Sequence, residues 1–273
     1  MIRILNEKDK PVVEEYLERN HIDTTFLIGN VKYFGLENKK DLRRCGDYYG
    51  YFENGILKGI IPFYNLGSCI PHFESKNAIP HFIDLMKNNE FKFLLGMKKF
   101  IEPLYNELKS LKQSGNISDS YYFVNNNFKE FIIPEVEIKS FHEIDLDCIT
   151  DFIVETNIKG FGNMKYTKDE AIKSLNQRSK DEDYLFLIKD NLIVAGANIQ
   201  TSTDRISQIG AVYTLPEHRG RGYCKAVVSN LCSRIISKGK IPTLIVRKNN
   251  MPAVKAYKAL GFEFYDEYLL IEF

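Results

Sequence analysis

Two arginines and two glycines stand directly in front of an apolar helical pattern, in the segment PEHRGRGYCKAVVSNL at residues 216–231. The first N–H groups of any helix have no partner inside the helix, and the helix dipole is positive at that end. Glycine lets a ligand approach the backbone closely. Arg219, Arg221 and Lys225 add positive charge. These residues therefore predict an anion site at the start of a helix, with a pyrophosphate as the favoured anion.

Three nucleotide-binding motifs compete for this loop. A Walker loop needs G-x-x-x-x-G-K-[ST], which the sequence lacks. The dinucleotide fingerprint G-x-G-x-x-G fails because Lys225 stands where its third glycine should be. The six residues R-G-R-G-Y-C, 219–224, match the pattern [QR]-x-x-G-x-[GA], except that Cys224 replaces the usual glycine or alanine. By itself so loose a pattern is also compatible with a solvated turn.

The neighbouring residues make the pattern specific. Val212-Tyr213-Thr214 and Pro216-Glu217 precede the loop, and NNMPAVKAYKALGF follows it at residues 249–262. The passage into the loop and this second segment, read as N-x-x-A-x-x-x-Y-x-x-x-G-F, resemble the two signatures of the GNAT-family N-acetyltransferases. The resemblance covers roughly residues 145–265. It implies an α+β fold in which helices flank a mixed, mainly antiparallel sheet.

The resemblance also implies an activity. Members of the family move an acetyl group from acetyl-CoA to an amine, which attacks the thioester directly in a ternary complex. The strand before the loop would pair with the pantetheine arm of the cofactor, and one of its N–H groups would stabilise the oxyanion. Asn250 would contact the cofactor as well as cap its helix, and Tyr257 would protonate the leaving thiolate of CoA rather than serve only as a core aromatic residue. The cofactor-binding residues implied in this way are Val212, Tyr213, Thr214, Arg219, Gly220, Arg221, Gly222, Tyr223, Cys224, Lys225 and Asn250.

The sequence leaves the general base open. Some relatives carry a glutamate at the position of Ile245, and others carry a carboxylate near the position of Gln208, but both residues here are neutral. Glu155 is a candidate on the first helix of this half, although a solvated helix face is the commoner place for such a residue. A base acting through water and an acceptor amine of low pKa stay open. So does a second function, a non-catalytic module that binds acyl-CoA or regulates.

Two segments half a chain apart look alike. DYYGYFENGILKGI begins at Asp47 and DYLFLIKDNLIVAG begins at Asp183, and each reads as strand, polar turn and strand. This offset of 136 residues predicts two similar domains in tandem, 1–135 and 136–273, although two unrelated hairpins would give the same pattern. The positions 136 residues before the loop, 83–88, hold no glycine or arginine. We therefore expect the first domain to be degenerate and not to bind CoA.

The second half predicts a regular series of elements. A helix starts near Leu146, and Thr167 with Glu170 forms a capping box in front of another. Strands are expected at 184–189, 192–200, 206–214 and 242–247, then a short helix that Asn250 caps and Gly261 ends. Only 12 residues follow Gly261, where family members place two strands. The second strand is either missing or supplied by residues 131–141 or by the first half.

Charge and composition narrow the partners. The 37 basic and 36 acidic residues give a net charge of +1, which disfavours nucleic acid. No stretch of 18 apolar residues predicts a membrane span, and the first ten residues do not read as a secretory signal. The expected partner is a small-molecule or peptide amine in the cytoplasm, with no membrane; the oligomeric state is not indicated.

Cysteine and histidine usage predicts neither disulfides nor a metal site. The five cysteines form no C-x-x-C pair, and His72 and His81 have no carboxylate or cysteine at ligand spacing. We therefore expect reduced thiols and no metal. Packing is the commoner role for Cys224, although a helix N-terminus would lower the pKa of its thiol.

Overall fold

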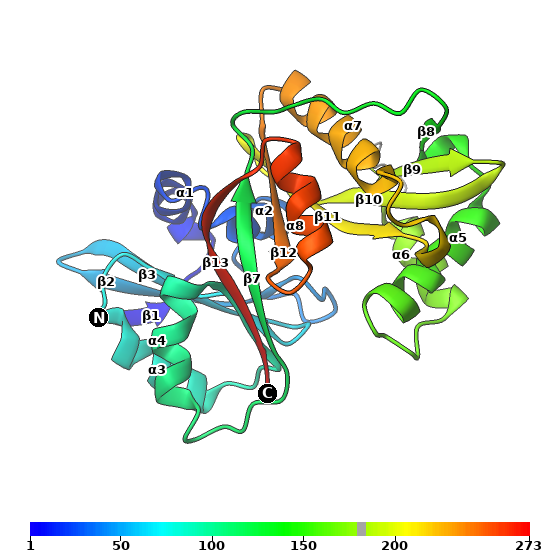
Figure 1. Cartoon of the computed structure of the whole chain (residues 1–273). Coiled ribbons are helices and arrows are strands. Elements are labelled where there is room, and N and C mark those ends of the chain that lie inside the picture. The colour runs from blue at the N-terminus through cyan, green and yellow to red at the C-terminus, as the bar shows by residue number, and fades with distance from the viewer. Residues whose placement is uncertain (179–183) are drawn as a thin grey trace.

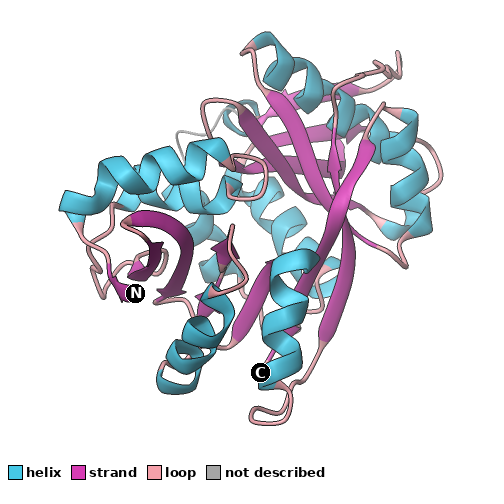
Figure 2. Cartoon of the chain, turned by 90° about the vertical axis from the view of Figure 1, so that its left-hand side faces the viewer, coloured by secondary structure: helices cyan, strands magenta, loops and turns pink. Residues whose placement is uncertain are grey.

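The structure is a computed structural model that describes residues 1–178 and 184–273, and in these residues one mixed sheet of 13 strands carries helices on both faces (Figures 1 and 2). The strands are β1 (Ile2–Ile4), β2 (Gly46–Glu53), β3 (Ile56–Tyr64), β4 (Ser68–Cys69), β5 (His72–Phe73), β6 (Phe93–Met97), β7 (Ile117–Val124), β8 (Glu137–Ser140), β9 (Tyr184–Lys189), β10 (Leu192–Ser202), β11 (Ile206–Thr214), β12 (Ile241–Arg247) and β13 (Glu263–Glu272). The helices are α1 (Lys10–Arg19), α2 (Thr25–Phe34), α3 (Ala78–Asn88), α4 (Lys98–Leu108), α5 (Leu146–Glu155), α6 (Lys168–Arg178), α7 (Tyr223–Ser237) and α8 (Met251–Ala259), with short turns η1 (Glu7–Asp9), η2 (Phe141–Glu143), η3 (Thr156–Gly160) and η4 (Pro216–His218). The spatial order of the strands is β1-β2-β3-β4-β6-β13-β7-β12-β11-β10-β9-β8, with β5 also paired to β3.

The two similar hairpins form where the turn residues predict them. Asn54 and Gly55 join β2 to β3, and Asp190 and Asn191 join β9 to β10. All four residues have positive φ angles, between 49° and 79°, as a two-residue type I′ turn requires. The second of the two similar segments begins at Asp183, which lies outside the described residues.

Local caps fix the starts of two helices in the second half. At the start of α6 the N–H of Thr167 donates to Glu170 Oε2 at 2.9 Å, and the N–H of Glu170 donates to Thr167 Oγ1 at 3.2 Å, so the predicted capping box is confirmed. Asn250 is the N-cap of α8, and its Oδ1 accepts from the N–H of Ala253 at 3.4 Å. The strands predicted at 184–189 and 206–214 match β9 and β11.

The two halves repeat one order of elements. Each half reads strand, two helices, hairpin, strand, helix, strand, helix, strand, from β1 to β7 and again from β8 to β13, with the fourth strand of the first half broken into β4 and β5. In each half the strand after the third helix runs parallel to the strand before it, β6 beside β4 and β12 beside β11. The predicted α+β architecture, a mixed and mainly antiparallel sheet flanked by helices, is confirmed, and the topology repeats as a tandem arrangement requires. A boundary at 135/136 stays a prediction.

The final strands of the two halves change places. β7 ends the first half but lies between β12 and β13 of the second, and β13 lies between β7 and β6 of the first (Figure 1). The strand that the sequence lacks after Gly261 is therefore supplied by residues 117–124 of the first half. Residues 131–141 do not supply it, because their strand, β8, pairs with β9 at the far end of the sheet.

Successive side chains of a strand point to opposite faces of the sheet, and this divides the core of the second half into two layers. Leu185 and Leu187 of β9 pack with α7 and α8 on one face, and Tyr184 and Phe186 pack with α5 and α6 on the other. The apolar repeat expected along α7 lies in the first of these layers. Within residues 1–178 and 184–273, no helix is both long and apolar enough to cross a bilayer.

The strand exchange predicts that the second half does not fold by itself. Residues 136–273 alone leave one edge of β12 and one edge of β13 without the β7 backbone, and expose the buried apolar side chains that β7 covers. We expect this fragment to be insoluble or to show no cooperative thermal transition in circular dichroism. The fragment 117–273, which restores β7, is the matched control and should recover part of the transition. A monomeric 136–273 with a sharp transition would contradict the exchange.

Candidate functional site

A wedge opens in the sheet of the second half where β11 and β12 part. Residues 206–209 of β11 pair in parallel with residues 241–244 of β12, and the pairing ends there. Farther along, β12 pairs with β7 while β11 stays beside β10. From Gly210 and Ile245 onwards the facing edges of the two strands are not paired with each other, so their backbone groups are available to a ligand.

A bulge lies on β11 at the start of this wedge. The register between β10 and β11 shifts there, so that Ala197 faces both Ala211 and Val212. Ala211 has a φ of 49°, a left-handed conformation that costs a non-glycine residue about 1–3 kcal/mol. Gly210, Ala211 and Val212 are half-buried although the strand is internal to the sheet. Such a strained and partly open strand is typical of a functional site.

The loop between β11 and α7 presents a row of free backbone donors. Gly220 and Gly222 have φ angles of 78° and 82°, which turn the chain into the helix, and Gly222 is the N-cap. Among the residues that the structure describes, no hydrogen-bond acceptor is found for any N–H group from Gly220 to Lys225. These donors lie at the positive end of a helix of 15 residues. The arrangement suits an anion, as the sequence predicts.

The charged side chains of the loop differ in how they are held. Arg219 Nε donates to the carbonyl oxygen of Thr214 at 3.1 Å, and its guanidinium lies 5.6 Å from the ring centroid of Tyr213. Arg221 is exposed. Lys225 is half-buried, and its Nζ lies 3.6 Å from the ring centroid of Phe131. Arg219 and Lys225 are thus positioned by neighbours, whereas Arg221 projects into solvent.

Gly222 is covered by a segment that sequence analysis did not connect with the loop. A Cβ built on Gly222 would lie 3.2 Å from Phe131 Cζ and 3.6 Å from Ile133 Cδ1. At Gly220 a Cβ would meet no atom within 4 Å. The apolar run Phe131-Ile132-Ile133 in an otherwise polar stretch was the sequence signal for a contact of this kind. Gly220 is therefore the open glycine of the loop, and Gly222 is a packing position.

Tyr257 lies on α8, opposite the start of α7. Its side chain is 5% exposed and belongs to the apolar cluster around α7, and the Cys224 thiol lies near it. Burial raises the pKa of Tyr257 well above its ordinary value. Burial also raises the pKa of Cys224 to about 11, so the expectation that the helix N-terminus lowers it is not met. Both groups are protonated at neutral pH, and Cys224 is a packing residue rather than a thiolate nucleophile.

Tyr223 and the residues of β11 contribute in different ways. The ring of Tyr223 is buried in the same cluster, so only its backbone faces the loop. The hydroxyl of Tyr213 and Oγ1 of Thr214 are buried, and neither has a hydrogen-bond partner among the residues that the structure describes. Asn250 caps α8, the helix that carries Tyr257.

The candidates for a general base are placed as follows. Glu155 ends α5, is half-buried, and pairs with Lys159 at 3.2 Å. Burial raises the pKa of Tyr213 and the negative charge of Glu155 adds to this, so Glu155 lies near Tyr213, which packs against α5. Ile245 stands on β12 opposite Tyr122. Gln208 is buried, and both polar atoms of its amide lack a partner among the described residues.

The loop of the first half that corresponds to 215–222 is residues 74–77, between β5 and α3. The positions chosen by the 136-residue offset, 83–88, lie inside α3 instead, so that part of the prediction is wrong. Burial alone would raise the pKa of Glu74 in this loop, but hydrogen bonds from Arg19, Asn20 and Lys58 lower it to about 2. A carboxylate at this place repels an anion.

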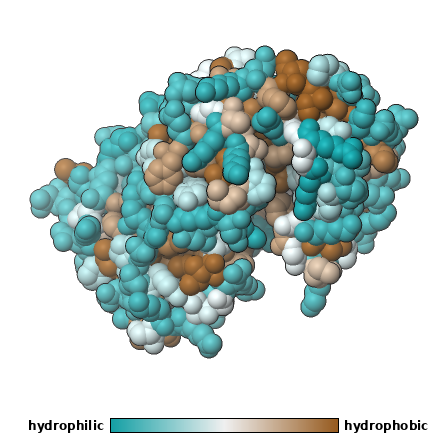
Figure 3. Space-filling view, viewed as in Figure 1, coloured by the Kyte–Doolittle hydropathy of each residue, from teal (hydrophilic) through white to brown (hydrophobic). Residues whose placement is uncertain are grey.

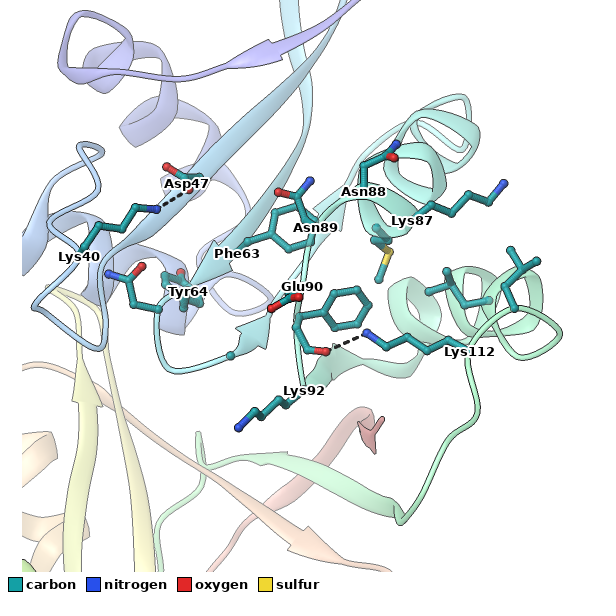
Figure 4. Close-up of a pocket in the computed structure, with 16 residues that line it drawn as sticks. Lys40, Asp47, Phe63, Tyr64, Lys87, Asn88, Asn89, Glu90, Lys92 and Lys112 are labelled. Atoms are coloured by element: carbon teal, nitrogen blue, oxygen red, sulfur yellow. Dashed lines mark hydrogen bonds and ion pairs between the residues drawn. The ribbon is translucent and has the colours of Figure 1, made fainter.

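A separate cavity of about 1000 Å³ lies in the first half, at the ends of β3, α3 and α4 (Figure 4). Phe63, Tyr64 and Phe91 line it together with several lysines. Lys112 donates to the carbonyl oxygen of Phe91 at 2.8 Å, as Figure 4 shows. All of its lining residues lie between Lys40 and Lys112, so this cavity is separate from the wedge and the loop.

The surface is hollowed between the lobe over α5 and α6 and the rest of the molecule (Figure 3). η3 follows α5 in that lobe, and a Cβ on its Gly160 would lie 2.7 Å from the ring of Tyr213 on β11. The splayed end of β11 therefore reaches this lobe.

His72 takes part in a buried hydrogen bond. The hydroxyl of Tyr16 lies 2.6 Å from His72 Nδ1 and 3.3 Å from the His72 carbonyl oxygen. Burial lowers the pKa of His72 to about 3. In residues 1–178 and 184–273, no three His, Cys, Asp or Glu side chains gather as a metal ion would need.

Comparisons with known proteins agree with this geometry. Residues 191–271 match the model of the family described as FR47-like protein. A GNAT-family acetyltransferase from Colwellia psychrerythraea superposes with a TM-score of 0.60 at 15% identity, over 100% of this chain and 99% of the other. A Drosophila protein superposes with a TM-score of 0.73 at 12% identity, over 99% of this chain and 97% of the other. A tandem GNAT protein from the clavulanic acid biosynthesis pathway superposes with a TM-score of 0.57 at 11% identity, over 99% of this chain and 97% of the other. No curated protein sequence matches the chain. The chain therefore has the GNAT fold, and the resemblance read from its two signatures is confirmed.

Gly220→Val is predicted to weaken anion binding. The side chain would stand among the free N–H groups and disfavour the left-handed φ that aims them, so the dissociation constant for inorganic pyrophosphate should rise about tenfold or more. Gly239→Val is the matched control, because Gly239 has a φ of 71° and equally open surroundings at the other end of α7. Both variants should lose similar stability, and only the first should lose binding in calorimetric titration. Equal affinity in the two variants would refute the site.

His72 is predicted to make the fold sensitive to acid. The pKa of His72 is about 3 in the folded protein and 6.5 in the unfolded chain. As pH falls below 6.5, His72 is therefore protonated in the unfolded chain but stays neutral in the folded protein, which favours unfolding. Stability should fall by about 1.4 kcal/mol per pH unit between pH 6 and pH 4 through this group. The variant His72→Phe keeps the backbone carbonyl of residue 72 as an acceptor for the Tyr16 hydroxyl. Its free energy of unfolding, measured by urea denaturation at pH 7 and at pH 5, should fall less between these two pH values than that of the wild type. Identical losses in both proteins would contradict this.

Proposed function

We propose that this chain, which has the GNAT fold, is an N-acetyltransferase that moves an acetyl group from acetyl-CoA to an amine by direct attack in a ternary complex. The observation that carries the proposal is the row of free N–H groups from Gly220 to Lys225, which stands at the end of a strand that parts from its neighbour. A helix start with free donors suits a pyrophosphate, and an open strand edge suits the amide groups of a pantetheine arm.

In this proposal the cofactor is held largely by backbone. Val212, Tyr213 and Thr214 would pair with the pantetheine arm along the open edge of β11, and one N–H of this strand would stabilise the oxyanion that forms when the amine attacks. Arg219 and Lys225 would add charge at the phosphates. Asn250 would act mainly as the cap that fixes α8.

Tyr257 would be the general acid that protonates the thiolate of CoA. A phenol is protonated at neutral pH even at its ordinary pKa, and the ring of Tyr257 packs in the apolar cluster around α7. A neutral donor does not repel the incoming amine.

The acceptor would be a small-molecule or peptide amine that enters from the hollow beside α5. Glu155 would be the candidate for a base acting through water, since its charge acts on Tyr213 of β11. The chain has a net charge of +1 and all five cysteines are free, which fits a cytoplasmic enzyme that does not bind nucleic acid.

A non-catalytic module that binds acyl-CoA is the alternative, and Ile245 favours it because no carboxylate stands at that position. The two functions separate in one experiment. Calorimetric titration measures binding of acetyl-CoA, and a thiol reagent measures release of CoA in the presence of a panel of primary amines. Binding with amine-dependent release supports the transferase. Binding without release supports the alternative, and no binding contradicts both.

Tyr257→Phe is predicted to lower kcat about 100-fold while stability and CoA affinity stay near normal. The change removes only the hydroxyl, so it keeps the ring that packs in the core. Tyr268→Phe is the matched control, because the Tyr268 hydroxyl is also buried but lies on β13 and not on α8. Steady-state rates of CoA release and thermal melts decide the matter. Unchanged turnover in Tyr257→Phe would falsify the general-acid role, and a loss of stability matching the loss of rate would mark Tyr257 as a core residue.

A further inference from the structure

The segment between β7 and β8, residues 125–136, is fastened to both helices of the candidate site; we call it the strap. Asn125 Nδ2 and the N–H of Lys129 both donate to the carbonyl oxygen of Leu260, at 3.0 Å and 2.9 Å, just after α8. The N–H of Phe131 donates to Ser229 Oγ on α7 at 2.8 Å. The strap thus leaves the exchanged strand β7 and crosses directly to the helix that begins at the free N–H groups (Figure 1).

Phe131 lies on one side of the first turns of α7. Its contacts are Gly222, Lys225 and Ser229, which share a side of the helix because they are spaced by three and four residues. Gly222 has no side chain there, so the ring packs directly on the backbone of the loop. A residue with a Cβ would meet the ring at 3.2 Å, which explains why the strap can lie so close only at a glycine.

Lys225 is held by this ring and not by a carboxylate. Its Nζ lies 3.6 Å from the Phe131 centroid, within the range of a cation–π contact. Among the residues that the structure describes, no acidic side chain forms an ion pair with Lys225. An ammonium group without an anion, fixed in the first turn beside free N–H groups, has its charge available to a ligand.

We propose that Phe131 is a positioning residue for the cofactor: it holds the Lys225 ammonium against the start of α7, ready for the phosphates of CoA. The cofactor site of the second half is then completed by the strap, a segment that the exchanged strand delivers. The identity of the anion as CoA rests on the proposed function, whereas the placement of Lys225 does not.

The contact has a size that experiment can detect. A cation–π pair at a partly exposed site contributes enough to change an affinity about two- to fivefold. Its effect should appear only with ligands that carry phosphate, because pantetheine offers Lys225 no negative charge. The effect should also vanish in a Lys225→Met variant, because no ammonium group is then left for Phe131 to position.

The test is a double-mutant cycle of Phe131→Leu and Lys225→Met, read by calorimetric titration with CoA, pantetheine and inorganic pyrophosphate. Phe131→Leu keeps an apolar side chain on Gly222, and the backbone bond to Ser229 Oγ is unchanged. We expect this variant to bind CoA and pyrophosphate about threefold more weakly than the wild type and to bind pantetheine with unchanged affinity. In the Lys225→Met background the same change should have no effect, and Phe131→Tyr should restore the wild-type affinity. Ile132→Ala, at a neighbouring strap residue that is 68% exposed, is the control and should bind as wild type.

The outcomes separate this inference from the proposed function. A threefold loss that persists in the Lys225→Met background, or that is equal for pantetheine, overturns the positioning role and leaves Phe131 as packing. Wild-type binding of pyrophosphate but not of CoA would refute the proposed cofactor, while the pyrophosphate cycle still decides the role of Phe131. No binding of either phosphate ligand would overturn both.

Discussion

The antiparallel pair of β7 and β13 is the constraint on which the rest of the structure depends. The two strands pair along nearly their whole length, from Glu263 opposite Val124 to Ile271 opposite Ile117, and each offers its other edge to the opposite half. Every backbone group of a buried strand needs a partner, so neither half can withdraw its strand without leaving two edges unpaired. The two repeats are therefore joined at the centre of one sheet rather than by a flexible linker.

The wedge is a consequence of this exchange. β12 can leave β11 after Leu244 because β7 accepts its backbone bonds over residues 243–247, and β11 stays satisfied on its other side by β10. The unpaired edges that remain face each other across the wedge, at the bulge of Ala211 and beside the free N–H groups of the loop. A sheet that closed this gap would have no open backbone near the helix start. The geometry that supports a cofactor site is thus supplied partly by a strand from the other half.

How much of this could be read from the sequence depends on the range of each interaction. The hairpin turns, the Thr167–Glu170 capping box, the glycine-rich loop and the limits of β9 and β11 rest on contacts within a few residues, and sequence analysis finds them. The exchange of β7 and the packing of Phe131 on Gly222 join residues about 90 to 155 positions apart, and no local pattern encodes them. The 136-residue offset failed for a related reason. It is set by the hairpin turns, whereas the strands β10 and β11 and the loop before α7 are all longer than their counterparts in the first half, so that one offset cannot align both the hairpins and the helices.

The loops at the same place in the two halves hold different charged side chains: Arg219 and Arg221 with Glu217 before α7, and Glu74 with Lys76 before α3. In the second half, the loop before α7 combines free N–H groups with Arg219 and Lys225; in the first half, the loop before α3 holds Glu74, whose charge is satisfied by Arg19 and Lys58. An anion at the first loop would have to displace two short ion pairs, 2.7 Å and 3.0 Å long, and would still face the carboxylate. The repeated fold therefore keeps one loop open to anions. The contribution of the first half to that loop is structural: a strand that lets the wedge open, and a strap whose aromatic ring holds the lysine beside it.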